Sequence, residues 1–229
     1  SGPVGPDAGT ILSGDEYTLT FGPVSVAPGE ENTQCMVVRL GNPAGFHVGQ
    51  IVNTLSTASH HFIVYRTNET VEQTTPFDCQ PFVDTLNPAA GSPLMITQRS
   101  DETLTLPPGV GFTLEADQMI RLELHFINPT GAPIDALATT TMRGIPDSAF
   151  TDEADFLFIG TPDIDLPPHV ATTVGPYFFR LPGSYADSHF FAITGHTHQY
   201  GTNVQVWAGG TEATATDPVY DVAPFLWDE

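Results

Sequence analysis

Residues 120–127 read Ile-Arg-Leu-Glu-Leu-His-Phe-Ile, the most regular stretch of the chain. Large apolar side chains occupy the even-numbered positions, and arginine, glutamate and histidine stand between them. This period of two is typical of a β-strand with one buried face. His125 is therefore predicted to lie on the face opposite the main apolar row. Asn-Pro-Thr-Gly at 128–131 predicts a turn at the end of the strand.

Short apolar segments continue on both sides of this strand, with glycine and proline between them. The chain has 21 glycines and 21 prolines in 229 residues, which favours many strands joined by tight turns and leaves little room for long helices. The sequence therefore predicts an all-β protein. Residues 67–93 are predicted to form a long loop, and the acidic stretch at 143–155 a linker. The other expected strands are 17–26, 35–40, 50–55, 60–65, 95–97, 112–114, 137–142, 156–159, 178–181, 190–194 and 203–207.

The charge of the chain excludes several classes of partner. Its 27 acidic residues face only six basic ones, for a net charge of −21. Such a surface repels nucleic acid and anionic membranes, because phosphate groups are bound by clustered cations. No apolar run approaches the roughly 18–20 residues that span a bilayer, so no membrane insertion is expected. Residues 1–6 have neither a basic start nor an apolar stretch, so any signal peptide is expected to have been removed.

Five of the eight histidines fall into three groups along the chain. His196 and His198 are two apart, so in a strand their side chains point the same way and can hold one metal ion together. His60 and His61 are adjacent, so they share an ion with each other and His125 only if a bulge or an irregular start interrupts the strand. A donor set rich in imidazole and poor in carboxylate and thiolate favours copper or zinc. Scattered, unrelated histidines are the alternative.

Other kinds of site find less support. The chain lacks the His-Glu-x-x-His and Cys-x-x-Cys patterns of common zinc sites, and the Gly-x-Ser-x-Gly turn that would present a serine nucleophile. Glu123, two residues before His125, is expected to be a solvated strand residue, with a role as acid or base as the alternative. Cys35 and Cys79 allow a single disulfide, with two buried free thiols as the alternative.

Five segments carry a resemblance to known proteins, in a consistent order and at similar separations. They are residues 33–40 (Thr-Gln-Cys-Met-Val-Val-Arg-Leu), 60–62 (His-His-Phe), 106–112 (Leu-Pro-Pro-Gly-Val-Gly-Phe), 122–129 (Leu-Glu-Leu-His-Phe-Ile-Asn-Pro) and 189–198, which ends in His-Thr-His. Together they resemble the copper type II, ascorbate-dependent monooxygenases, the family of the peptidylglycine α-hydroxylating enzyme and dopamine β-hydroxylase. The resemblance covers about residues 33–207, with interruptions.

This resemblance implies two jelly-roll-like antiparallel β-sandwich domains with one copper site each. Residues 1–145 would hold the electron-transfer copper on His60, His61 and His125. Residues 146–229 would hold the oxygen-activating copper on His196 and His198. The family's third ligand to that second copper is a methionine, yet no methionine follows His198. Either the second sandwich is truncated, which the abrupt end of the chain favours, or another group completes the site.

The resemblance also implies the chemistry and its setting. The reaction would hydroxylate a C–H bond of a small organic substrate with dioxygen and an external reductant such as ascorbate. Thr194 and Gly195 stand where the peptidylglycine branch has an arginine, which favours an amine or a neutral substrate. His189 would support the site without binding metal. A Cys35–Cys79 disulfide would match the family and a secreted, periplasmic or extracellular protein. A copper-binding relative without turnover, or a metal-free β-sandwich, would be the alternatives.

Overall fold

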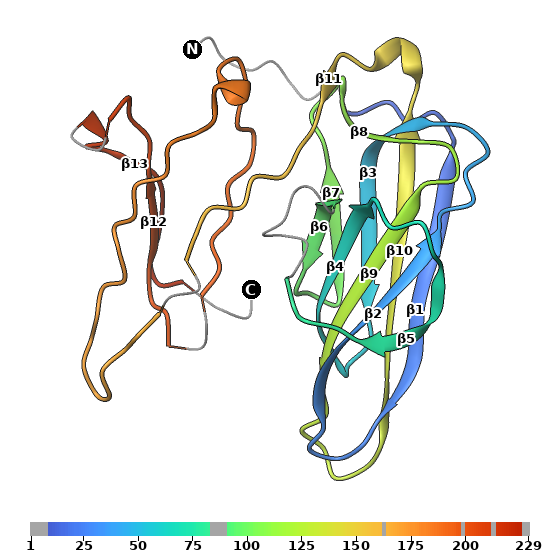
Figure 1. Ribbon diagram of the computed structural model, residues 1–229, viewed down its shortest axis with the longest axis horizontal. Coiled ribbons are helices and arrows are strands. Elements are labelled where there is room, and N and C mark those ends of the chain that lie inside the picture. Colours follow the sequence, from blue (N-terminus) through green and yellow to red (C-terminus); the bar gives the residue numbers. More distant parts are fainter. Residues whose placement is uncertain (1–8, 83–90, 162–163, 198–199, 212–213, 226–229) are drawn as a thin grey trace. The chain divides into compact units, whose positions relative to one another are not determined.

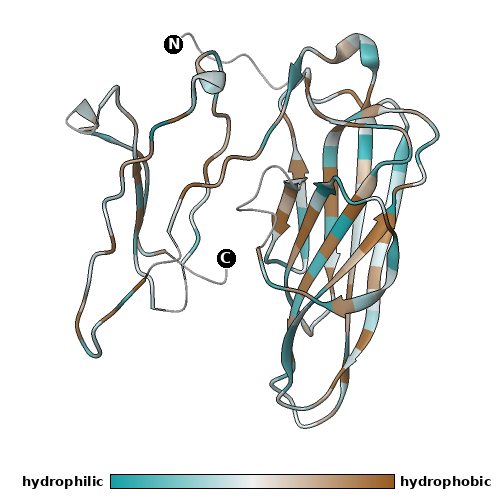
Figure 2. Cartoon of the chain, viewed as in Figure 1, coloured by the Kyte–Doolittle hydropathy of each residue, from teal (hydrophilic) through white to brown (hydrophobic). Residues whose placement is uncertain are grey.

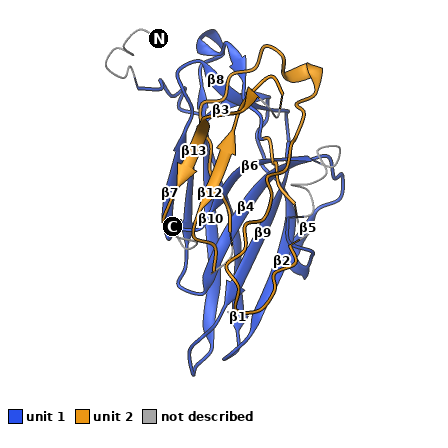
Figure 3. Cartoon of the chain, turned by 90° about the vertical axis from the view of Figure 1, so that its left-hand side faces the viewer, with its two compact units in different colours: residues 1–156 blue, residues 157–229 orange. Residues whose placement is uncertain are grey.

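The computed structural model describes residues 9–82, 91–161, 164–197, 200–211 and 214–225. The chain divides into two compact units, unit 1 at residues 1–156 and unit 2 at residues 157–229 (Figure 3). Strands dominate, and the described residues contain no α-helix, which confirms the predicted all-β class. Nowhere in the described ranges is a helix both long and apolar enough to cross a membrane.

Unit 1 is a sandwich of two sheets (Figure 1). All neighbouring strands in them are antiparallel except the short β8–β11 pair. The six-stranded sheet consists, in order, of β1 (Glu16–Val26), β10 (Ile134–Ile145), β3 (Phe46–Leu55), β8 (Val110–Leu114) and β11 (Asp152–Glu153), with β7 (Asp101–Thr105) also paired to β3. The five-stranded sheet consists of β5 (Gln73–Asp78), β2 (Glu31–Arg39), β9 (Met119–Ile127), β4 (Ser59–Thr67) and β6 (Gly91–Thr97).

One hydrophobic core fills the space between the two sheets. It draws on both of them, with Phe21 and Met142 from the six-stranded sheet and Phe62, Leu122 and Phe126 from the five-stranded one, all inaccessible to solvent. Apolar and polar residues alternate along these strands, as Figure 2 shows by its brown and teal bands. Burial of large apolar side chains is the main force that holds such a sandwich together.

The second face of the five-stranded sheet is buried around Glu123. In β9 the even-numbered residues face the core as predicted, but Glu123 on the opposite face is also fully buried. Its cross-strand neighbours, Cys35 of β2 and Ile63 of β4, are equally inaccessible. The prediction that Glu123 is solvated is therefore wrong, because its carboxylate group is enclosed and bonded to the Tyr65 hydroxyl group and the Phe82 backbone N–H.

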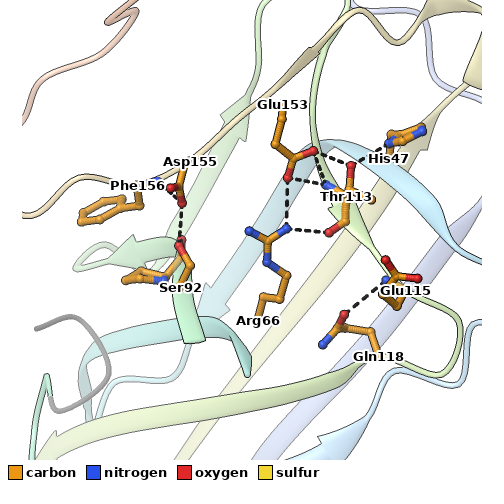
Figure 4. A network of polar contacts seen from close by, with 10 residues as sticks. His47, Arg66, Ser92, Thr113, Glu115, Gln118, Glu153, Asp155 and Phe156 are labelled. Carbon is orange, nitrogen blue, oxygen red and sulfur yellow. Dashed lines mark hydrogen bonds and ion pairs between the residues drawn. The ribbon is translucent and has the colours of Figure 1, made fainter. Parts of the chain in front are cut away.

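Residues that follow β10 are fixed to unit 1 by a network of polar contacts (Figure 4). Glu153 of β11 accepts hydrogen bonds from the Arg66 guanidinium group (3.0 Å) and from the backbone N–H (3.1 Å) and hydroxyl group of Thr113. Asp155 accepts a hydrogen bond from the Ser92 hydroxyl group at 2.9 Å. These contacts explain why the compact unit continues to residue 156, beyond the boundary at 145 that the sequence suggested.

Unit 2 contains little regular structure in its described residues. A two-stranded antiparallel sheet joins β12 (Val204–Trp207) to β13 (Pro218–Val222). Short 3-10 helices are η2 (Gly183–Tyr185) here and η1 (Asp147–Ala149) in unit 1. The strand predicted at 203–207 is confirmed, whereas those predicted at 156–159, 178–181 and 190–194 are wrong. A strand requires backbone partners, and β propensity alone does not supply them.

Candidate functional site

An irregularity in the pairing of β4 with β9 positions the first histidine group. Ser59 lies opposite Phe126, but the next registered pair is His61 with His125, so the register shifts across His60. Two steps along β4 therefore match one step along β9, which is the arrangement of a β-bulge. A bulge interrupts the strict alternation of side chains between the two faces of a strand. This irregularity allows the adjacent His60 and His61 to lie on the same side as His125.

The three imidazole rings of unit 1 lie close together at this bulge. Ring centroids are 4.5 Å apart for His61 and His125, 5.4 Å for His60 and His125, and 5.5 Å for His60 and His61. The Nε2 atom of His61 and the Nδ1 atom of His125 are 2.8 Å apart, within hydrogen-bonding distance. His61 is buried, and His60 and His125 are partly exposed. The structure therefore brings together all three histidines that the sequence assigned to the first copper.

These separations agree with those of imidazoles around one metal ion. A nitrogen ligand lies about 2.0 Å from copper or zinc, which puts its ring centroid about 3.2 Å from the ion. Rings spread at about 90–120° then have centroids about 4.5–5.5 Å apart, and two nitrogens at about 90° lie about 2.8 Å apart. As the side chains stand, however, no group of three or more described His, Cys, Asp or Glu residues could hold a metal ion. A three-nitrogen site therefore requires at least one ring to rotate.

Two further side chains contact this group. The Glu31 carboxylate group lies 3.0 Å from Nε2 of His125, and the Phe82 ring lies 5.3 Å from the His61 ring, centroid to centroid. The backbone N–H of Phe82 donates a hydrogen bond to Oε1 of Glu123 (3.0 Å), and the Tyr65 hydroxyl group donates one to Oε2 (3.1 Å). The sequence signalled none of these roles, although Glu123 shares a strand face with His125.

A disulfide between Cys35 and Cys79 confirms the predicted pairing. Cys35 is fully buried in β2, and Cys79 directly follows β5, inside the stretch that the sequence assigned to a loop. The bond therefore ties residue 79 to the buried outer face of the five-stranded sheet. Phe82, which contacts His61, comes only three residues later.

Acid is expected to weaken the attachment of β5 to β2 through Asp78. Its carboxylate group accepts hydrogen bonds from Gln34 (3.0 Å) and Asn32 (2.8 Å), which lower its pKa, the Gln34 bond contributing most. Stability gained from a lowered carboxyl pKa is present above the unfolded value and lost as pH falls through the folded value. Gln34→Ala should therefore raise the pKa of Asp78 and flatten the loss of stability below about pH 4.

Carboxyl carbon titration by NMR would give the Asp78 pKa in both proteins, and urea unfolding at neutral pH and about pH 3 would give the stabilities. The change in stability should be small because this carboxylate is exposed to solvent. An Asp78 pKa that does not move in Gln34→Ala would contradict the prediction.

The second predicted histidine group lies in unit 2. His189 and His196 are exposed, and both stand in segments without strand structure. The expectation that His196 lies on or just after a strand is therefore wrong. His198 lies outside the described residues, so its geometry relative to His196 stays a prediction.

Comparisons with known proteins add no family to this picture. A scan against protein-family models finds no match to the chain, and a search of curated proteins finds none either. The resemblance to the copper monooxygenases therefore rests on the sequence motifs.

Proposed function

We propose that this chain binds copper through His60, His61 and His125 and acts as a copper-dependent monooxygenase on a small organic substrate. The observation that carries the proposal is the β-bulge at His60, because it gathers three imidazoles that regular pairing would separate. Dioxygen and an external reductant such as ascorbate would be the other reactants. The intrachain disulfide supports a secreted, periplasmic or extracellular protein.

The donor set favours copper among the metals that imidazole binds. Both cysteines form the disulfide, so thiolate is not a donor here. With imidazole nitrogens alone, Cu(II) has the highest affinity among the divalent first-row metals, with zinc as the chief competitor. The 2.8 Å separation between His61 Nε2 and His125 Nδ1 also suits two neighbouring positions of a tetragonal copper site.

The chain itself would position and desolvate these ligands. Pairing of β4 with β9 holds His61 opposite His125, while the Phe82 ring contacts His61. A metal would take the place of the hydrogen between His61 and His125, and His61 would remain a neutral ligand with its proton on Nδ1. Bound copper would supply one-electron transfer here and, at His196 and His198, the activation of dioxygen that the family resemblance implies.

A copper-binding protein without turnover is the second candidate. All three histidines of the bulge belong to unit 1, so one copper site requires nothing from unit 2. Ascorbate-driven oxygen consumption that depends on an added amine or neutral substrate would favour the enzyme, whereas tight copper without such consumption would favour the binding protein.

Copper per chain after loading and desalting tests the proposal. Wild type should hold two coppers, and His60→Ala/His61→Ala and His196→Ala/His198→Ala should each lose one. His169→Ala is the matched control, because His169 is exposed and lies outside both groups. One copper, lost only with His60 and His61, would favour the binding protein. The proposal would be refuted if wild type held no copper tightly. It would also be refuted if both double variants bound as much copper per chain as wild type.

A further inference from the structure

Glu31 lies where its carboxylate group can contact the Nε2 atom of His125. It is the first residue of β2, where Thr33 is directly opposite His125 and Glu31 is opposite Ile127. Residues two apart in a strand share a face, so Glu31 is the diagonal neighbour of His125 on the histidine face. Its Oε1 atom lies 3.0 Å from Nε2 of His125, and its side chain keeps 58% of its surface exposed.

The contact determines which nitrogen of His125 carries hydrogen. A carboxylate oxygen can only accept a hydrogen bond. The Nε2 atom of His125 must therefore be the donor, and in a neutral imidazole this leaves Nδ1 with a lone pair. That lone pair faces Nε2 of His61 at 2.8 Å, so His61 donates the second hydrogen bond. One carboxylate thus orders a chain from Glu31 through His125 to His61.

We propose that Glu31 is a positioning residue that holds His125 as the Nε2–H tautomer and presents its Nδ1 atom to His61 and to a bound metal. The metal part of this inference rests on the proposed function; the tautomer does not. A carboxylate that accepts from the distal nitrogen of a histidine ligand fixes the ring orientation and raises the basicity of the ligating nitrogen. His125 would then bind through Nδ1 and His61 through Nε2.

Three substitutions separate this role from a general effect of charge. Glu31→Ala removes the acceptor, whereas Glu31→Gln keeps a neutral side-chain oxygen that can still accept from Nε2. Glu30→Ala is the matched control, because Glu30 directly precedes Glu31 and its carboxylate group accepts a hydrogen bond from the backbone N–H of Ala27. It removes the same charge as Glu31→Ala.

The first measurement is imidazole nitrogen NMR of the metal-free protein at about pH 8.5, where an ordinary imidazole is neutral. Wild type, Glu31→Gln and Glu30→Ala should show a protonated Nε2 and an unprotonated Nδ1 at His125, with an Nε2 proton protected from exchange. In Glu31→Ala that proton should exchange at least about tenfold faster. An Nδ1–H form in wild type, or the same exchange rate in Glu31→Ala, would overturn the inference.

The second measurement is Cu(II) affinity by competition with a chelator. Glu31→Ala should bind about 10- to 100-fold more weakly than wild type, with partial rescue in Glu31→Gln and little change in Glu30→Ala. If Glu31→Ala and Glu30→Ala lowered the Cu(II) affinity equally, Glu31 would act only through its charge, and its role in positioning His125 at the metal would be overturned. If wild type holds no copper but the NMR result is as expected, the proposed function fails and the tautomer assignment stands.

Discussion

Replacing both Cys35 and Cys79 by alanine is expected to lower the free energy of unfolding by about 4 kcal/mol. The disulfide joins residues 44 apart in sequence, so it removes much of the freedom of the unfolded chain. By the chain-entropy estimate, a loop of this length contributes about 4 kcal/mol. The loss should be large because Cys35 is also fully buried, so its replacement removes packed atoms from the sheet.

Urea unfolding of oxidised wild type and of the alanine variant measures this loss. Reduced wild type is the matched control, because it retains both sulfur atoms and lacks only the covalent bond. It should lie close to the alanine variant and far below the oxidised protein. A loss below about 1 kcal/mol in both would show that the unfolded chain is already restricted near residues 35–79.

The sequence predicted unit 1 well because its strands alternate. The alternation at 120–127 identifies a strand and its buried face without knowledge of the neighbouring strand, since one face packs on the core. β5 lies in a segment that the sequence predicts to be a loop, because Gln-Thr-Thr-Pro-Phe-Asp has no alternation and forms an edge strand that contains a proline. The strands predicted in unit 2 at 178–181 and 190–194 failed for the opposite reason: they are apolar but have no paired neighbour.

The sequence predicted which three histidines of unit 1 would meet, but it did not predict which side chains contact them. Histidine is rare enough in this chain for His60, His61 and His125 to be noticed, and the need for a bulge was foreseen from their spacing. The bulge itself depends on how β4 pairs with β9, which no local pattern encodes. Glu31 and Glu123 are two of many acidic residues in the sequence. Only the tertiary structure shows that Glu31 contacts His125 and that Glu123 is buried.

Glu123→Ala is expected to destabilise the protein by about 2–4 kcal/mol, the second largest effect. The carboxylate group is fully buried and accepts hydrogen bonds from the Tyr65 hydroxyl group and the Phe82 backbone N–H. Truncation removes the acceptor from both donors and leaves a cavity beneath the segment that carries Phe82. Thermal and urea unfolding measure the loss, with Glu115→Ala as the matched control because Glu115 is exposed. Equal stability of the two variants would contradict the prediction.

The two substitutions should not be additive, because they release the same short segment. The disulfide fastens residue 79 to β2, and Glu123 fastens Phe82 to β9 on the same buried face, where Cys35 and Glu123 are cross-strand partners. Once the disulfide is absent, part of the Glu123–Phe82 contact is lost already, so Glu123→Ala should cost less in the cysteine-free background. A double-mutant cycle should therefore give a coupling of about 1 kcal/mol or more. Strict additivity would mean that each contact acts alone, and the Phe82 ring would then need another support to stay against His61.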